Sequence, residues 1–393
     1  MSFIHRAVES EVLKGARLFS GLLLTGPRRA GKTTLLKKLF PKAQYHLLED
    51  PDVIDRIRSD PRSFLDGLKT PVLLDEMQNT PELFNYIRTR MDARPAKKGQ
   101  WLMTGSQEAP LMRGISESMA GRIAIFHLLP FSTQESSKVS FFSGGFPEVL
   151  AHPSARELYF RSYVQTYLER DVRAVTSIRD LANFRRFLSI LASRSGTVLN
   201  RAELASSLGV SIPTISEWLG VLEITSQVII VPPYYENFGK RLIKSPKIYF
   251  TDSGLLCHFL GIHSEKALVQ SIFLGPVFES FTASEIVKAQ LNAGHQKELY
   301  YFRDQQGLEI DFLVPRGPGR LLFLEAKATR TLHPRVGLNL DRLSRNARKY
   351  KVERAVVHLN LKKGCSALTA LRPGVTAISI NQLSKWIGIP RTS

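Results

Sequence analysis

One stretch of the chain has the residue types and the spacing needed to bind a nucleoside triphosphate. Residues 26–33 follow the pattern G-x-x-x-x-G-K-T, after a short apolar run and before a leucine-rich segment. Glycines let backbone N–H groups approach phosphates, the Lys32 ammonium neutralises phosphate charge, and a threonine hydroxyl ligates Mg²⁺. The flanking segments favour a nucleotide site over a plain Gly-rich turn. The residues predicted to bind ATP are Gly26, Pro27, Arg28, Arg29, Ala30, Gly31, Lys32, Thr33 and Thr34.

Two adjacent carboxylates, Asp75 and Glu76, follow a second apolar run at residues 71–74. Phosphoryl transfer from ATP needs a held metal ion and an oriented water more than it needs covalent chemistry. We therefore predict that Thr33 and Asp75 form the Mg²⁺ site and that Glu76 is the catalytic base that orients and deprotonates water.

A third apolar run, residues 101–103, ends in Thr104, Gly105 and Ser106. Thr104 and Ser106 are candidates for contact with the γ-phosphate or the attacking water, and capping of the strand end is the alternative role. Farther on, Arg122 precedes another apolar segment. Its guanidinium is a candidate arginine finger for the nucleotide of a neighbouring subunit, and a surface salt bridge is the alternative.

A second set of chemically capable residues lies near the C-terminus. Glu325 and Lys327 are two apart in a predicted strand, so both side chains project from one face. If Asp311 lies on the paired strand, two carboxylates and an ammonium converge, which suits metal-assisted phosphodiester cleavage. We predict Asp311, Glu325 and Lys327 as catalytic residues. Glu279, Asp311 and Glu325 are the predicted metal ligands.

The elements that must position these residues follow from the apolar pattern. We expect a helix within residues 1–20, and parallel strands near residues 22–25, 43–50, 71–75, 101–105 and 123–126. Toward the C-terminus we expect an amphipathic helix at 275–287 and strands at 298–302, 308–314 and 320–327. The fold class is α/β in both regions.

The middle of the chain predicts a helical segment followed by a winged helix-turn-helix. Residues 154–194 show helical periodicity, and Arg170 within them either senses nucleotide or pairs with a neighbouring carboxylate. In residues 201–222, Gly209 supplies a turn between two helices that share an apolar core. Two strands, 228–231 and 247–250, would form the wing, which serves either to bind DNA or to pack. The basic residues expected to line it are Lys240, Arg241, Lys244 and Lys247.

The order of these motifs resembles that of a known family. Residues 26–33, 73–76, 102–106, 120–122, 129–132 and 144–148 are similar to motifs of bacterial and archaeal AAA-type P-loop ATPases with a C-terminal winged helix plus a PD-(D/E)xK nuclease-like domain. The D-x₁₃-E-x-K spacing from Asp311 to Lys327 resembles the PD-(D/E)xK core, although Ile310 stands where that motif has proline. The resemblance implies ATP binding and hydrolysis, and it names no biological task.

The charge of the chain points to a polyanionic partner. Lys and Arg total 54 against 35 Asp and Glu, a formal net charge of +19 over 393 residues. We expect nucleic acid, with DNA as the favoured form, because such a surplus suits phosphate contacts. A basic stretch between Arg335 and Arg354 fits this expectation, and a solvated helix is its alternative explanation.

Two cysteines without metal-ligand spacing, Cys257 and Cys365, fit a reducing compartment. The chain has no apolar run long enough to span a membrane, and its first residues lack the apolar core of a secretory signal. We therefore expect a cytoplasmic protein without membrane association. We also expect a homo-oligomer.

These observations predict four parts: an AAA-type ATPase core at 1–150, a helical lid at 151–196, a winged helix at 197–252 and a nuclease-like domain at 253–393. The predicted function is Mg²⁺-dependent ATP hydrolysis coupled to action on nucleic acid, with ATP and Mg²⁺ as cofactors. The alternative is an ATP-switched regulator whose C-terminal domain binds a partner without cutting.

Overall fold

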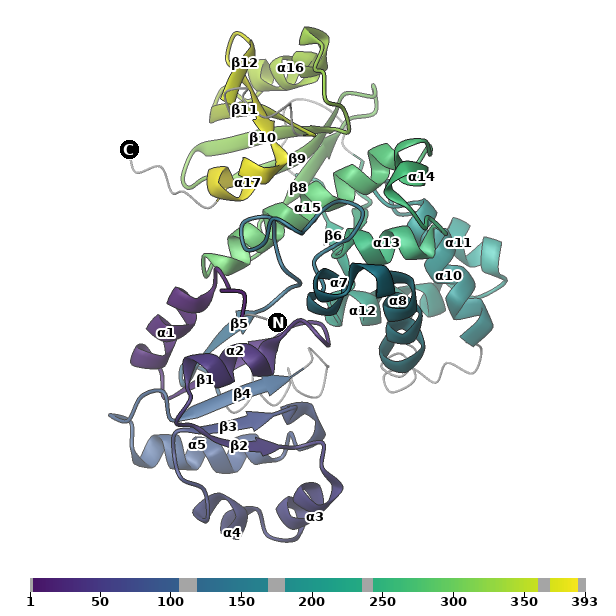
Figure 1. Ribbon diagram of the computed structural model, residues 1–393. Helices are drawn as coiled ribbons and strands as arrows, with labels where there is room; N and C mark the ends of the chain where they lie inside the picture. Colours follow the sequence, from purple (N-terminus) through teal and green to yellow (C-terminus); the bar gives the residue numbers. More distant parts are fainter. Residues whose placement is uncertain (1–2, 106–118, 169–180, 235–242, 360–367, 388–393) are drawn as a thin grey trace. The chain divides into compact units, whose positions relative to one another are not determined.

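The computed structural model describes residues 3–105, 119–168, 181–234, 243–359 and 368–387 (Figure 1). Ser106, Arg170, Lys240 and Arg241 lie outside the described residues. The chain forms two compact units. Unit 1 comprises residues 1–130 with 224–226 and 291–295, and unit 2 comprises the remainder.

Unit 1 is built on a parallel sheet in the order β2-β3-β4-β1-β5. β1 pairs in parallel with both β4 and β5, and β3 pairs in parallel with β2 and β4. The carboxyl ends of all five strands therefore lie at one edge of the sheet. The strands are β1 (Gly21–Thr25), β2 (Gln44–Leu47), β3 (Val72–Asp75), β4 (Trp101–Gly105) and β5 (Ile123–His127). The predicted strands are confirmed.

Helices cover both faces of this sheet because successive strand residues point to opposite sides. Leu22 and Leu24 pack with helices α1 and α2, while Leu23 packs with α3, α4 and α5 on the other face. The helices are α1 (Glu9–Leu18), α2 (Lys32–Leu39), α3 (Pro51–Ser59), α4 (Pro61–Asp66) and α5 (Leu83–Ala93).

The first part of unit 2 is mainly helical and contains a two-stranded hairpin, β6 and β7. Gly209 has φ 66° between α11 and α12, so it adopts the left-handed turn that the sequence predicts. Leu204, Ile215 and Trp218 share the core beside it. The elements are α7 (Pro147–Ala151), α8 (Arg156–Tyr163), the π-helical turn η3 (Val164–Leu168), α10 (Leu181–Ser193), α11 (Arg201–Leu208), α12 (Ile212–Ile224), β6 (Val228–Val231), β7 (Lys247–Phe250), α13 (Ser253–Phe259) and α14 (Glu265–Val269).

The second part of unit 2 is a long helix, α15, and a six-stranded sheet in the order β12-β13-β11-β10-β9-β8. β8, β9 and β10 are antiparallel neighbours, and β11 joins β10 in parallel after helix α16. The elements are α15 (Leu274–Asn292), β8 (Tyr300–Arg303), β9 (Glu309–Pro315), β10 (Arg320–Lys327), α16 (Leu338–Asn346), β11 (Lys351–His358), β12 (Leu368–Arg372), β13 (Val375–Ser379) and α17 (Ile380–Ile387).

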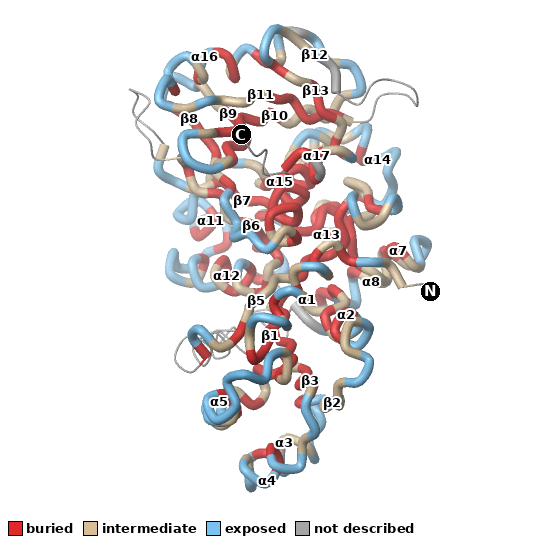
Figure 2. Tube along the Cα trace, turned by 90° about the vertical axis from the view of Figure 1, so that its left-hand side faces the viewer, coloured by how far each residue is buried: buried red, intermediate tan, exposed pale blue. Residues whose placement is uncertain are grey.

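The predicted helix at 275–287 is confirmed as part of α15, but the prediction that it is amphipathic is wrong. Residues 280–290 of α15 are buried on every face, as the continuous red tube in Figure 2 shows. The polar residues that suggested a wet face have partners inside the protein, such as Glu285 with Thr133 and Lys288 with the Phe131 carbonyl. Across the described ranges, no helix is long and apolar enough to cross a membrane.

Candidate functional site

The loop between β1 and α2 has the backbone that a phosphate-binding loop requires. Gly26 has φ 139°, and a Cβ there would meet the Leu128 carbonyl oxygen at 2.1 Å, so no side chain fits. Gly31 has φ 96° and caps the N-terminus of α2. The loop therefore directs the start of α2 and its N–H groups toward the carboxyl edge of the sheet, which is the arrangement that binds phosphate.

Two cations hold this loop. Lys32 is 5% exposed, and its Nζ donates to the carbonyls of Gly26 at 3.0 Å and Pro27 at 3.1 Å. Arg6, which the sequence analysis did not single out, donates to the carbonyls of Ala30 at 2.9 Å and Leu129 at 2.6 Å. Arg28 is half-buried, and Arg29 is exposed with φ 62°. Pro27 and Ala30 are buried and Thr34 is exposed.

Asp75 is the centre of a network of hydroxyl groups at the end of β3. Thr33 Oγ1 donates to Asp75 Oδ1 at 2.8 Å and Oδ2 at 3.0 Å, and Thr104 also donates to Oδ1. Tyr45 donates its phenolic hydrogen to Oδ2 at 2.9 Å. Burial and the neighbouring Asp75 raise the pKa of Tyr45, so the phenol stays protonated. The Thr33 hydroxyl and the Asp75 carboxylate are thus held together, as a Mg²⁺–nucleotide site requires.

Glu76 follows directly in a left-handed conformation, with φ 64° and ψ 52°. Its backbone N–H donates to Thr104 Oγ1 at 3.1 Å. The amide of Gln78 donates to Glu76 Oε2 at 2.5 Å, so the carboxylate is oriented by a residue two positions later. Thr104 therefore contacts both predicted acidic residues and also serves as a strand-end cap.

Arg122 lies at the other edge of the sheet. Its neighbour Ile123 is in register with Gly21, the first residue of β1, whereas the phosphate loop follows Thr25 at the far end. Arg122 binds Asp92 with Nε at 2.6 Å and Nη2 at 3.0 Å. The salt bridge is thus the contact it makes within the chain, and it does not reach the nucleotide site of its own subunit.

The C-terminal carboxylates and Lys327 gather at one place on the sheet of unit 2. Lys327 Nζ is 2.8 Å from Glu325 Oε1, so the two side chains share a face as predicted. Asp311 on the neighbouring strand accepts the Ala326 N–H at 2.9 Å. Burial raises the pKa of Glu325, while the ammonium of Lys327 opposes that shift. The Oε2 atom of Glu325 is buried without a hydrogen-bond partner.

Glu279 is engaged by residues of the hairpin rather than by the other two predicted metal ligands. Its Oε1 accepts from Tyr249 at 2.6 Å and from Lys247 at 3.1 Å. Burial and the nearby Asp311 raise the pKa of Glu279 to about 7. In the part of the chain that the structure describes, no group of three or more His, Cys, Asp and Glu side chains is placed to hold a metal ion.

The basic wing is also different from the prediction. Lys247 is 2% exposed and joins Glu279 to Glu309, whose Oε1 lies 2.6 Å from Lys247 Nζ. It is an internal ion-pair residue and cannot face a DNA phosphate. Lys244 is exposed.

Sequence patterns did not identify Arg6, Tyr45, Gln78 or Tyr249. Tyr45 reaches Asp75 because β2 pairs with β3. The order of elements along the chain does not predict this pairing. Arg6 precedes α1 and carries no motif. Only a structural pairing of distant segments could have indicated either residue.

Comparison with known protein families places an AAA domain at residues 19–137. Two domains of unknown function follow, DUF8612 at 135–266 and DUF4143 at 274–381. Among solved structures, a Walker-type ATPase of Pyrococcus abyssi is similar at a TM-score of 0.40 and 15% identity, over 64% of this chain and 94% of that chain. A signal transduction ATPase with numerous domains from Pyrococcus horikoshii has a TM-score of 0.24 at 12% identity, over 74% of this chain and 47% of that chain.

Two mycobacterial relatives are more similar in sequence. An uncharacterized protein of Mycobacterium tuberculosis and one of Mycobacterium bovis are each 34% identical over 317 residues, which cover 79% of this chain and 70% of theirs. The phosphate loop, Asp75 and Glu76 all fall within the matched AAA domain. The chain therefore belongs to the same family as these two mycobacterial proteins and carries an AAA-type P-loop ATPase domain.

Proposed function

We propose that the protein hydrolyses ATP in a Mg²⁺-dependent reaction and acts on nucleic acid. The observation that carries the first part is the contact of Thr33 and Thr104 with Asp75 beside the phosphate loop. Thr33 and Asp75 would hold Mg²⁺, which would neutralise phosphate charge. Lys32 and the loop N–H groups would bind the triphosphate, and Glu76 would orient and deprotonate water.

Nucleotide binding is tested with Lys32→Ala. The variant should lose ATP binding in equilibrium dialysis, because the ammonium that would neutralise phosphate charge is gone. Lys38→Ala is the matched control, since Lys38 is an exposed lysine of the same helix. Equal ATP affinity of the Lys32 variant and the wild type would contradict the proposed site.

Helix α16 supports the nucleic-acid part of the proposal. Its apolar face, with Leu340 and Leu343, is buried against the sheet, and the other face is basic. Five exposed cations on and after this helix make no ion pair within the described ranges: Arg342, Arg345, Arg348, Lys349 and Lys351. A cluster of unpaired cations on one surface is the expected footprint of phosphate contacts.

A nuclease-like C-terminal domain is the second part of the proposal. The order in unit 2 is helix α15, antiparallel β8, β9 and β10, then α16 and the parallel strand β11, and this order resembles the PD-(D/E)xK core. We also infer that residues 197–252 form a winged helix. Mg²⁺ often takes only one or two carboxylates and completes its ligands with water and phosphate. Asp311 and Glu325 are such a pair, and Glu325 Oε2 is a buried oxygen that a cation would satisfy.

The test uses the full chain with panels of DNA and RNA, with and without ATP and Mg²⁺. Wild type should cut at least one nucleic acid, and Lys327→Ala should not, while its ATP hydrolysis stays unchanged. Lys266→Ala is the control, because Lys266 is an exposed lysine of α14 that makes no ion pair with Asp311 or Glu325 in the described residues. ATP hydrolysis and nucleic-acid binding without any cleavage would support the ATP-switched regulator instead.

The same proposal includes a functional division into an ATPase core at 1–150, a lid at 151–196, a winged helix at 197–252 and a nuclease-like domain at 253–393. It also includes a homo-oligomer in which Arg122 exchanges Asp92 for the γ-phosphate of a neighbouring subunit. Mixing Arg122→Ala with Lys32→Ala subunits tests this arrangement, because only a shared site would let the mixture recover activity.

A further inference from the structure

Unit 1 contains a cavity that the ATP site does not use. Its volume is about 300 Å³, and it lies under the amino ends of β1, β3 and β4, beside the C-terminal end of α5. The phosphate loop lies at the opposite end of β1. At about 3.3 Å per residue, the length of this strand separates the two by about 17 Å. A volume near 300 Å³ is at the lower end of ligand sites and matches a ligand of mononucleotide size.

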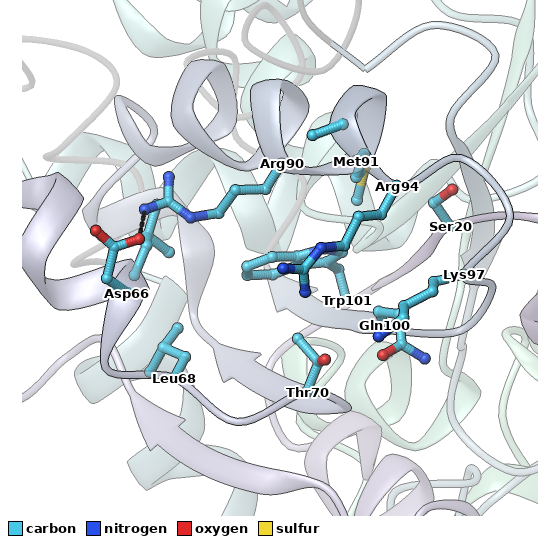
Figure 3. Close-up of a pocket in the computed structure, with 12 residues that line it drawn as sticks. Ser20, Asp66, Leu68, Thr70, Arg90, Met91, Arg94, Lys97, Gln100 and Trp101 are labelled. Carbon is cyan, nitrogen blue, oxygen red and sulfur yellow. Dashed lines mark hydrogen bonds and ion pairs between the residues drawn. The ribbon is translucent and has the colours of Figure 1, made fainter.

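The charges that line the cavity are unbalanced. Arg90 is neutralised by Asp66, whose carboxylate oxygen is 2.5 Å from the guanidinium, as the dashed line in Figure 3 shows. Arg94 and Lys97 also line the cavity, and neither makes an ion pair with any described residue. Two positive charges therefore remain for an anion.

The rest of the lining suits a flat ring beside that anion. Trp101, which is 5% exposed and packs in the core of unit 1, forms the apolar floor of the cavity with Leu68 and Met91. Figure 3 shows the indole in the middle of the site, beside Arg94 and above Thr70. Bases pack on aromatic side chains in sites where nearby cations contact the phosphates. Thr70 and Gln100 add hydrogen-bonding groups at the rim.

We propose that this cavity binds a nucleotide, with the phosphate at Arg94 and Lys97 and the base against Trp101. Two negative charges on a nucleoside monophosphate match the two cations that have no ion pair. The same chemistry is presented by the phosphorylated end of a single strand of nucleic acid, so the experiment includes both sources. This inference is independent of ATP binding at the phosphate loop.

The test measures binding of AMP to the full chain by calorimetry, in the wild type and in Lys32→Ala. AMP should bind one site in Lys32→Ala, in which the phosphate loop no longer contributes to the measurement, and the wild type should show this site as well. Arg94→Ala and Lys97→Ala should each weaken AMP about tenfold or more, the factor expected for one charge-assisted contact. Lys98→Ala is the matched control, since Lys98 is exposed next to Lys97 but does not line the cavity.

Ribose 5-phosphate, inorganic phosphate and a 5′-phosphorylated oligothymidylate complete the experiment. The first two should bind clearly more weakly than AMP, because they lack a base to pack on Trp101. If the oligothymidylate competes with AMP, the natural ligand is a phosphorylated strand end. If it does not compete, the natural ligand is a free nucleotide. Either outcome supports the site. Absent AMP binding, equal binding of inorganic phosphate, or affinity insensitive to Arg94 and Lys97 would overturn the proposal.

Discussion

Removing the Arg6 guanidinium should loosen the phosphate loop. Arg6 is 6% exposed, and its two bonds join the carbonyl of Ala30, inside the loop, to that of Leu129, beyond β5. Arg6→Met keeps most of the aliphatic stem but leaves both buried carbonyls without this donor. A hydrogen bond to a charged group contributes about 1.5–3 kcal/mol. The substitution removes two such bonds, but it also removes a buried charge, and the second effect offsets part of the first. We expect unit 1 to lose about 3 kcal/mol of unfolding free energy.

Hydrogen–deuterium exchange measures this loss within unit 1, because a probe of the whole chain would mix the two units. Amides of residues 22–39 should exchange about a hundredfold faster in Arg6→Met, the factor that corresponds to about 3 kcal/mol. ATP affinity should fall as well, because the loop N–H groups are no longer held in place. Arg17→Met is the control, since Arg17 is exposed on α1. Unchanged exchange at residues 22–39 together with unchanged ATP affinity would refute the role given to Arg6.

Three further predictions follow from the geometry. Thr104→Val keeps the side-chain shape but removes the bonds to Asp75 and Glu76, so Mg²⁺–ATP affinity, measured by calorimetry, should fall by about 1–3 kcal/mol. Burial lowers the pKa of His127 below its ordinary 6.5, so the folded state binds fewer protons and stability should be lost as pH falls below that value. Denaturation at pH 8 and pH 5 checks this, and the loss should shrink in His127→Asn. Reversing Arg342, Arg345 and Arg348 to Glu should weaken duplex binding and reduce the slope against log salt by up to about 3; an unchanged slope would remove α16 from the interface.

The sequence predicted the geometry of the phosphate-loop segment and of Asp75 well because the pattern is local. Residues 26–33 form one continuous segment that runs from the loop into the start of α2, and Asp75 ends a strand whose apolar pattern is plain. Thr33 meets Asp75 because both lie at the carboxyl edge of a parallel sheet, a geometric rule that the spacing of strands already implies. Glu325 and Lys327 are likewise joined by the two-residue period of a strand.

The failures share one cause, which is pairing between distant segments. Lys247 looked like a wing cation, but β7 packs beside α15 and the ammonium pairs with Glu279 and Glu309. The polar residues of α15 looked solvent-facing, but the protein covers that helix on every side and supplies their partners. Tyr45 is bound to Asp75 through a strand pairing that carries no sequence signal. Burial and partner choice of this kind arise from tertiary packing.

The most direct test of the account is steady-state ATP hydrolysis by the full chain, the wild type beside Glu76→Gln, with ATP binding measured on the same samples. Wild type should hydrolyse ATP only with Mg²⁺. Glu76→Gln should bind ATP with wild-type affinity and hydrolyse it about a hundredfold more slowly, because only the base that activates water is lost. No hydrolysis by the wild type, or equal turnover by Glu76→Gln, would contradict the account.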